Sequence, residues 1–149
     1  MEDKKYEKYV SKVKDATQDF LQSHKPTGAE LGPFYILLGE DVMPDSDMRV
    51  AVRHVLKGRV IAEYPDYVDR HTHDVSKGYI FLSEEPDSLE ADVTLGKEKY
   101  SVKSPAAVYV PPGLEHDMKI TKGHGFLIII MPMKGTYNEH TFPVAADKP

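Results

Sequence analysis

The sequence contains no cysteine and no tryptophan among its 149 residues. The lack of cysteine excludes a disulfide framework, a thiolate zinc site, an iron–sulfur cluster and a cysteine nucleophile. Long hydrophobic runs are lacking as well, since the longest, at residues 126–131, is far shorter than the roughly 20 residues that span a bilayer. The first six residues are mostly charged and contain no apolar signal-peptide core. We therefore expect a cytoplasmic protein without a membrane partner.

Positive charge is in deficit, with 19 Lys and Arg against 24 Asp and Glu and a formal net charge of −5. Because neutralisation of phosphates supplies most of the affinity for nucleic acid, this balance excludes a general nucleic-acid-binding protein. A chain of this length forms one domain and buries enough surface to fold without cross-links. The composition thus predicts one folded domain that has no nucleic-acid partner.

The first part of the chain has the periodicity of a helix, and the rest has that of strands. Apolar residues recur every three or four positions between residues 6 and 21, which predicts one amphipathic helix on the outside of the main domain. From Gly32 onward, short apolar segments alternate with Gly, Pro, Asp and Asn, and no second helical pattern interrupts them. This pattern excludes a parallel β/α fold and predicts an all-β antiparallel sandwich or barrel. The predicted strands are 34–38, 48–56, 59–64, 78–83, 90–95, 99–102, 106–110, 116–121 and 126–131.

Three of the seven histidines stand at positions suited to metal binding. His71 and His73 lie two residues apart ahead of the predicted strand 78–83, and on an extended chain such residues project from one face. His116 follows a Pro-Pro-Gly sequence at 111–113, which favours a tight reversal that aims the histidine inward at the start of the next strand. Neutral imidazole nitrogen is a preferred ligand of borderline divalent metals. The sequence therefore predicts that these three side chains converge on one metal ion.

The same residues carry a resemblance to a known family. The H-x-H at 71–73 and the P-x-G-x-x-H formed by Pro111, Gly113 and His116 resemble the two motifs of the cupin superfamily. The resemblance extends over about residues 49–131. It implies a double-stranded β-helix, or jelly-roll, barrel with one divalent metal inside, and a homodimer. The domains implied are an N-terminal helical extension at 1–30, the cupin barrel at 31–141 and a tail at 142–149.

The first motif departs from the family pattern at its carboxylate ligand, where this chain has Lys77. Residues 71, 73 and 77 share strand parity, so Lys77 points into the same cavity as the two histidines. Four arrangements stay open: a three-histidine metal site with Lys77 beside it, a site completed by a carboxylate of Asp74 or Glu63, a metal-free site with Lys77 at the metal position, and a loop that turns Lys77 outward. In the first of these, Lys77 acts as a general base or binds an anionic substrate.

Strand parity adds further inward residues. Tyr79 shares the face of Lys77, and Met118 shares the face of His116. The Tyr79 hydroxyl is able to move a proton, and the alternative is a core aromatic whose hydroxyl bonds to the backbone. Met118 is a candidate for the substrate pocket.

Strand 48–56 has an aliphatic face that contains His54, which predicts a core histidine with satisfied hydrogen bonds. Arg53 lies on the other face, where it is either a surface charge or a clamp for a carboxylate. Arg53 and Glu63 are accordingly candidate pocket residues. The remaining histidines are expected in solvent: His24, His124 and His140.

Together these residues predict a small-molecule metalloenzyme. His71, His73 and His116 hold one divalent ion (Fe, Mn, Ni or Zn) that acts as a Lewis acid on a small acid or carbonyl substrate, while Lys77 and Tyr79 move protons. Oxygenase, isomerase and lyase chemistry all stay open. The competing hypothesis is a non-catalytic, metal-free binding module that holds a small organic acid through Lys77 and Arg53.

Overall fold

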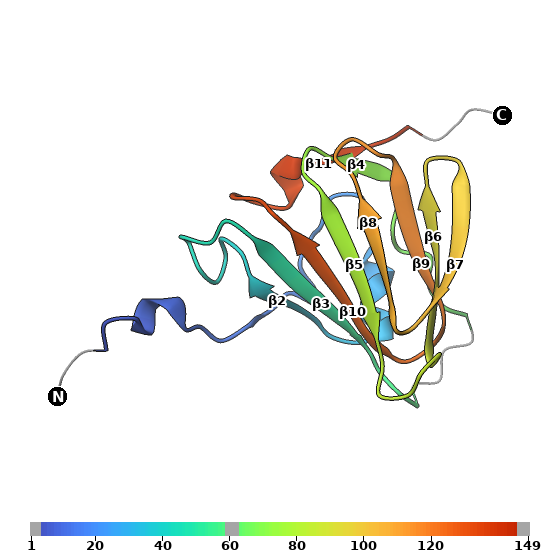
Figure 1. The fold of residues 1–149 in the computed structure, drawn as a ribbon, viewed down its shortest axis with the longest axis horizontal. Coiled ribbons are helices and arrows are strands. Elements are labelled where there is room, and N and C mark those ends of the chain that lie inside the picture. The colour runs from blue at the N-terminus through green and yellow to red at the C-terminus, as the bar shows by residue number, and fades with distance from the viewer. Residues whose placement is uncertain (1–3, 59–62, 146–149) are drawn as a thin grey trace.

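The computed structural model describes residues 4–58 and 63–145, and the structural statements below concern these residues. Two antiparallel sheets face each other and enclose the core between them (Figure 1). The six-stranded sheet has the order β1 (Lys14–Asp15), β2 (Phe34–Leu38), β3 (Arg49–Val55), β10 (Gly125–Met131), β5 (Lys77–Leu82) and β8 (Ala106–Val110). The five-stranded sheet has the order β11 (Thr141–Pro143), β4 (His71–His73), β9 (His116–Gly123), β6 (Leu89–Leu95) and β7 (Glu98–Lys103). Three short 3₁₀ turns complete the fold: η1 (Glu7–Tyr9), η2 (Pro26–Leu31) and η3 (Asn138–His140).

Along the central strands, buried and partly exposed side chains alternate, and the buried ones form the core. In β6, Leu89, Ala91 and Val93 are fully buried, while the residues between them are half-buried. Strands β5 and β9 alternate in the same way, and their inward residues meet those of β6 between the sheets. The predicted all-β class is thus confirmed. The residues that were expected to point inward from the two strands carrying Lys77 and His116 do point inward.

The predicted strands are found within two residues of their expected bounds, with the exception of 59–64. Residues 59–62 of that strand lie outside the described part of the chain, and the next two residues are not in a strand. The β6–β7 hairpin forms at the two-residue loop Gly96–Lys97, where Gly96 has φ +61°. Across the described ranges, no helix is long and apolar enough to span a bilayer.

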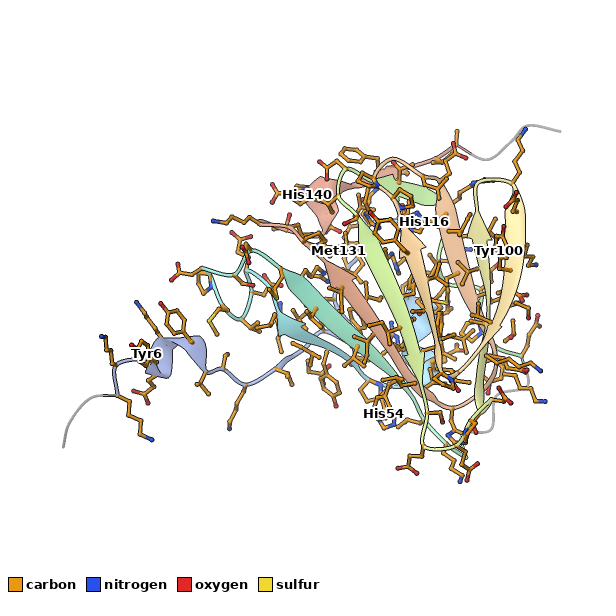
Figure 2. All side chains as sticks on the ribbon, viewed as in Figure 1. Tyr6, His54, Tyr100, His116, Met131 and His140 are labelled. Carbon is orange, nitrogen blue, oxygen red and sulfur yellow. The ribbon has the colours of Figure 1, made fainter. Side chains whose placement is uncertain are left out.

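The predicted N-terminal amphipathic helix is wrong. The segment forms only the turn η1 and the two-residue strand β1, which pairs with β2. Side chains of Tyr6, Tyr9 and Val10 are more than half exposed, and Tyr6 stands on an arm that extends from the two sheets (Figure 2). A helix of this length depends on burying its apolar stripe. In this structure only Ala16 and Leu21 of the stripe pack against the core, and its other apolar side chains are exposed.

The prediction of which face of β3 points into the core is also wrong. Arg49, Ala51, Arg53 and Val55 point into the core, whereas His54 stacks on the partly exposed Phe126 with ring centroids 4.4 Å apart. The reason lies in the neighbouring strand β10, which pairs its own Phe and Ile residues with the aliphatic face of β3. Both faces of this sheet therefore carry apolar side chains, and hydrophobicity does not distinguish the inner face from the outer one.

Candidate metal centre

His71, His73 and His116 converge in the interior, between β4 and β9. Strand β4 pairs with β9 through His71 and His116, which are direct neighbours across the two strands. Their ring centroids lie 4.4 Å apart, and the His73 ring lies 4.7 Å from His71 and 5.1 Å from His116. All three side chains are at most 2% exposed, and one ligand nitrogen from each falls within 4.8 Å of the others.

The Pro-Pro-Gly corner positions His116 as the sequence predicted. Gly113 has φ +81°, a conformation that favours glycine. Its N–H donates to the carbonyl of His73 over 2.8 Å, which ties the corner directly to β4. The predicted convergence of the three histidines is thus confirmed.

Each imidazole is held in the tautomer that suits a metal ligand. The Nδ1 atoms of His71, His116 and His73 bond to backbone carbonyls at 2.6, 2.9 and 3.1 Å, respectively. Because a carbonyl oxygen only accepts, each Nδ1 is the donor, and each Nε2 is left as an acceptor. The buried Nε2 atoms of His71 and His116 have no hydrogen-bond partner within the described residues. Two orphaned acceptors facing a third imidazole fit a borderline divalent cation.

Burial keeps the three rings neutral. It lowers the pKa of His71 to about 4 and the pKa values of His73 and His116 to about 2, and the nearby Lys77 adds to each shift. Desolvation disfavours the imidazolium form, so the rings are unprotonated at neutral pH. Unprotonated imidazole is the form that binds a metal.

Lys77 points inward, so the outward loop considered from the sequence is wrong. It is the first residue of β5 and only 2% exposed. Its Nζ lies 3.3 Å from His73 Nε2 and 4.5 Å from the centroid of the Tyr79 ring. Burial, with a smaller contribution from the charge on Arg49, lowers the pKa of Lys77 to about 7. The lysine thus occupies the position that the family gives to a carboxylate, beside the histidine nitrogens.

No carboxylate joins the three histidines in the described part of the chain. Asp74 is more than half exposed at its side chain and accepts a 2.7 Å bond from His140 Nδ1. Glu63 is exposed, in a bend after the undescribed residues, so its place in the pocket gains no support. Neither acid therefore takes the role of the carboxylate ligand of the first cupin motif, at whose position this chain has Lys77.

The other candidate residues lie on the core side of their strands. Tyr79 is 1% exposed, its ring centroid is 6.2 Å from that of His116, and burial raises its pKa well above the usual value. Met118 is buried in the main core cluster. Arg53 is 6% exposed, and its Nη1 donates to the carbonyl of Gly32 over 3.0 Å. Their assigned roles in catalysis and substrate binding stay predictions.

Residues near the site that the sequence did not reveal come from outside the two motifs. His24, expected in solvent, lies with its ring 5.6 Å from the His71 ring, and burial lowers its pKa to about 3. The Tyr137 ring packs 5.4 Å from His73, with the guanidinium of Arg49 4.9 Å from its centroid. His24 and Tyr137 lie in irregular segments without periodicity, which explains why no sequence signal marked them.

Comparisons with known proteins place the fold. No protein-family model and no curated protein matches the sequence. A structure of oxalate decarboxylase from Bacillus subtilis superposes with a TM-score of 0.58 at 13% identity, covering 91% of this chain and 32% of that one. Another structure of that enzyme, described by its Mn(II) centres, gives a TM-score of 0.57 at 13% identity over 91% of this chain and 33% of that one.

An RmlC-like cupin from Shewanella frigidimarina superposes less closely, with a TM-score of 0.45 at 17% identity over 67% of this chain and 75% of that one. The chain spans about a third of the length of oxalate decarboxylase. These likenesses concern the fold, which the two facing sheets and the three inward histidines already indicate. The chain therefore shares the two-sheet fold of the oxalate decarboxylase structures, with a three-histidine group in its interior that could bind a metal ion.

Proposed function

We propose that the chain binds one divalent metal ion through the Nε2 atoms of His71, His73 and His116 and acts on a small acid or carbonyl compound. The observation that carries the proposal is the set of three backbone-bonded Nδ1 atoms, which turns all three Nε2 atoms into acceptors. Those of His71 and His116 have no partner, and that of His73 accepts from Lys77 Nζ. Imidazole ligands suit Fe, Mn, Ni and Zn. The Mn(II) centres of oxalate decarboxylase support a metal in this fold.

When bound, such an ion supplies Lewis-acid polarisation of a substrate oxygen. The chain's own contribution is to exclude water and to place donors around that point. Lys77 holds N–H donors beside His73 Nε2, where they bind an anionic group or carry a proton at Nζ. Tyr79 lies under the Lys77 ammonium and orients it through its ring. Oxygenase, isomerase and lyase reactions are all compatible with these roles.

Elemental analysis tests the proposal. The chain is purified without a nickel resin and its metal content is measured, alongside the variants His71→Ala and His116→Ala. The expected result is close to one divalent ion per chain, lost in both variants. An Asp74→Ala variant serves as control, because its carboxylate is not part of the histidine group. Absence of metal after incubation with each of the four ions would refute the proposal.

A metal-free binding module is the second candidate, and one observation favours it. Lys77 Nζ already satisfies His73 Nε2 at 3.3 Å, as a cation in place of the metal would. A small organic acid would then bind to Lys77 without turnover. The variant Lys77→Met separates the candidates, since it abolishes acid binding in the module but leaves the three metal ligands in place.

The homodimer and the cytoplasmic location expected from the sequence belong to this proposal as well. The apolar side chains on the N-terminal arm, among them Tyr6 and Val10, are exposed in the single chain, which is compatible with a second copy as partner. Light scattering after gel filtration measures the mass directly. A monomer at micromolar concentration would refute the dimer.

A further inference from the structure

The outer faces of the two sheets carry different side chains. On the five-stranded sheet, acidic and basic groups of neighbouring strands form ion pairs: Glu90 on β6 pairs with Lys103 on β7 at 3.2 Å, and Asp92 pairs with Lys99 at 3.7 Å. A sheet face that meets water is normally polar in this way. The outer face of the six-stranded sheet has no such pairs among the strands described below, and its side chains are apolar.

Three apolar rows cross the outer face of the six-stranded sheet from β2 through β3, β10 and β5 to β8. The strand register aligns Tyr35, Val52, Ile128, Ile80 and Ala107 in the first row, Leu38, Val50, Ile130, Gly78 and Tyr109 in the second, and His54, Phe126 and Leu82 in the third. These five strands are fully described, and their only Lys and Arg residues point inward: Arg49, Arg53 and Lys77. The face therefore offers apolar contact without a charge that would have to lose its water.

This face is open to solvent in the single chain. Tyr109 is 67% exposed, and Leu82, Phe126 and Ile130 are each 38–42% exposed. Five strands about 4.8 Å apart, with about 20 Å of strand length, make a patch of about 400 Å². Contiguous apolar patches of this size on folded proteins often mark interaction sites.

The N-terminal arm, residues 4–13, carries a second set of exposed apolar side chains. Tyr6, Tyr9, Val10 and Val13 are 49–80% exposed, and the arm extends away from both sheets (Figure 2). It continues into β1, which pairs with β2 at the edge of the six-stranded sheet. Ten residues span at most about 33 Å, which exceeds the width of the five strands. The arm thus leaves the body beside the apolar face and is long enough to reach a second molecule packed on that face.

We propose that two copies of the chain pack the outer faces of their six-stranded sheets together and that each N-terminal arm lies on the partner. The two faces alone would bury about 800 Å², whereas a stable interface buries about 1,600 Å² in total, so the arms supply the remainder. The chain exposes 9235 Å² for a mass of 16.8 kDa, which is roughly 1,600 Å² more than a compact monomer of that mass. The inference rests on the homodimer of the proposed function and names the surface that forms it.

The charge of the chain favours a second copy at this face. Each chain has a formal net charge of −5, so two copies repel where their charged surfaces meet. The apolar face lets them approach without bringing like charges into contact. In a two-fold dimer each face meets an identical face, and an uncharged face needs no complementary charge on its partner.

Sedimentation velocity of the full chain over a range of micromolar concentrations tests the proposal. The unmodified chain is expected to sediment as a dimer. Tyr109→Lys and Ile130→Lys each place two charges in the interface, one from each copy, and are expected to raise the dissociation constant by about a hundredfold or more. The matched control is Tyr100→Lys, the same substitution at an exposed tyrosine on β7 of the other sheet, which is expected to leave the constant unchanged.

The double variant Tyr9→Ser with Val10→Ser tests the arm. Both side chains are more than half exposed in the single chain, so their loss should leave the fold intact and weaken the dimer by about tenfold or more. Circular dichroism checks that each variant is folded. A dimer that survives both lysine variants would refute this face and leave the homodimer standing, whereas a monomeric unmodified chain would overturn both. A monomer that binds phosphatidylcholine vesicles would assign the face to a lipid surface instead. Metal content is measured separately, so none of these outcomes decides the metal centre.

Discussion

The position of Lys77 leads to a quantitative prediction for the variant Lys77→Met. Its Nζ lies 3.3 Å from His73 Nε2 and donates to the lone pair that a metal ion would need. Metal binding must break this bond, and a hydrogen bond to a charged group contributes about 1.5–3 kcal/mol. Methionine has a similar length and no charge, so the variant removes this competition. We expect the metal affinity to rise by about ten- to a hundredfold.

The assay is a competitive titration of zinc against a chromophoric chelator of known affinity. The matched control is Lys103→Met, the same substitution at an exposed site on β7, which is expected to leave the affinity unchanged. Thermal unfolding of the metal-free variants checks that both are folded. Equal or weaker zinc binding by Lys77→Met would show that the lysine does not compete for His73, and the account of the site would have to be revised.

Two further predictions concern the fold that holds the site. Gly123, the last residue of β9, has φ +85°, and a Cβ there would overlap the backbone carbonyl of Ser88, so Gly123→Ala should lower the free energy of unfolding by about 3 kcal/mol or more. Gly58→Ala, also at positive φ but with open space around it, should cost about 1 kcal/mol. Ile120 is fully buried, so Ile120→Ala should cost about 2–5 kcal/mol. Urea unfolding measures all three, and equal losses at the two glycines would contradict the clash.

The histidine site was predictable from the sequence because two local rules determine it. Residues two apart on a strand share a face, which puts His71 and His73 together, and the Pro-Pro-Gly corner brings His116 to them. Both rules act on a few neighbouring residues, and the pairing of β4 with β9 then joins the two segments. The inward position of Lys77 follows from the same parity, although the sequence alone left it open.

The rest of the site depends on contacts that no local pattern encodes. His24 reaches the site from an irregular segment, held where Lys25 N–H donates to the carbonyl of Tyr67 over 2.7 Å. Arg49 was missed because β3 is apolar on its outer face, and the aliphatic side was expected to be the core. The prediction of an N-terminal helix failed for a related reason, since the fold packs only Ala16 and Leu21 of the apolar stripe and leaves its other apolar side chains exposed. The periodicity of apolar residues shows which face of a segment is apolar, but it does not show which other part of the chain covers that face.

X-ray absorption spectroscopy of the zinc-loaded chain tests the central claim most directly, because it counts the ligands of the ion. We predict three imidazole nitrogens at about 2.0–2.1 Å from the zinc ion. In the variant His73→Ala we predict that zinc no longer binds, so that the signal of all three nitrogens disappears together. A spectrum with fewer than three imidazoles, or a zinc ion held by carboxylates alone, would contradict the account.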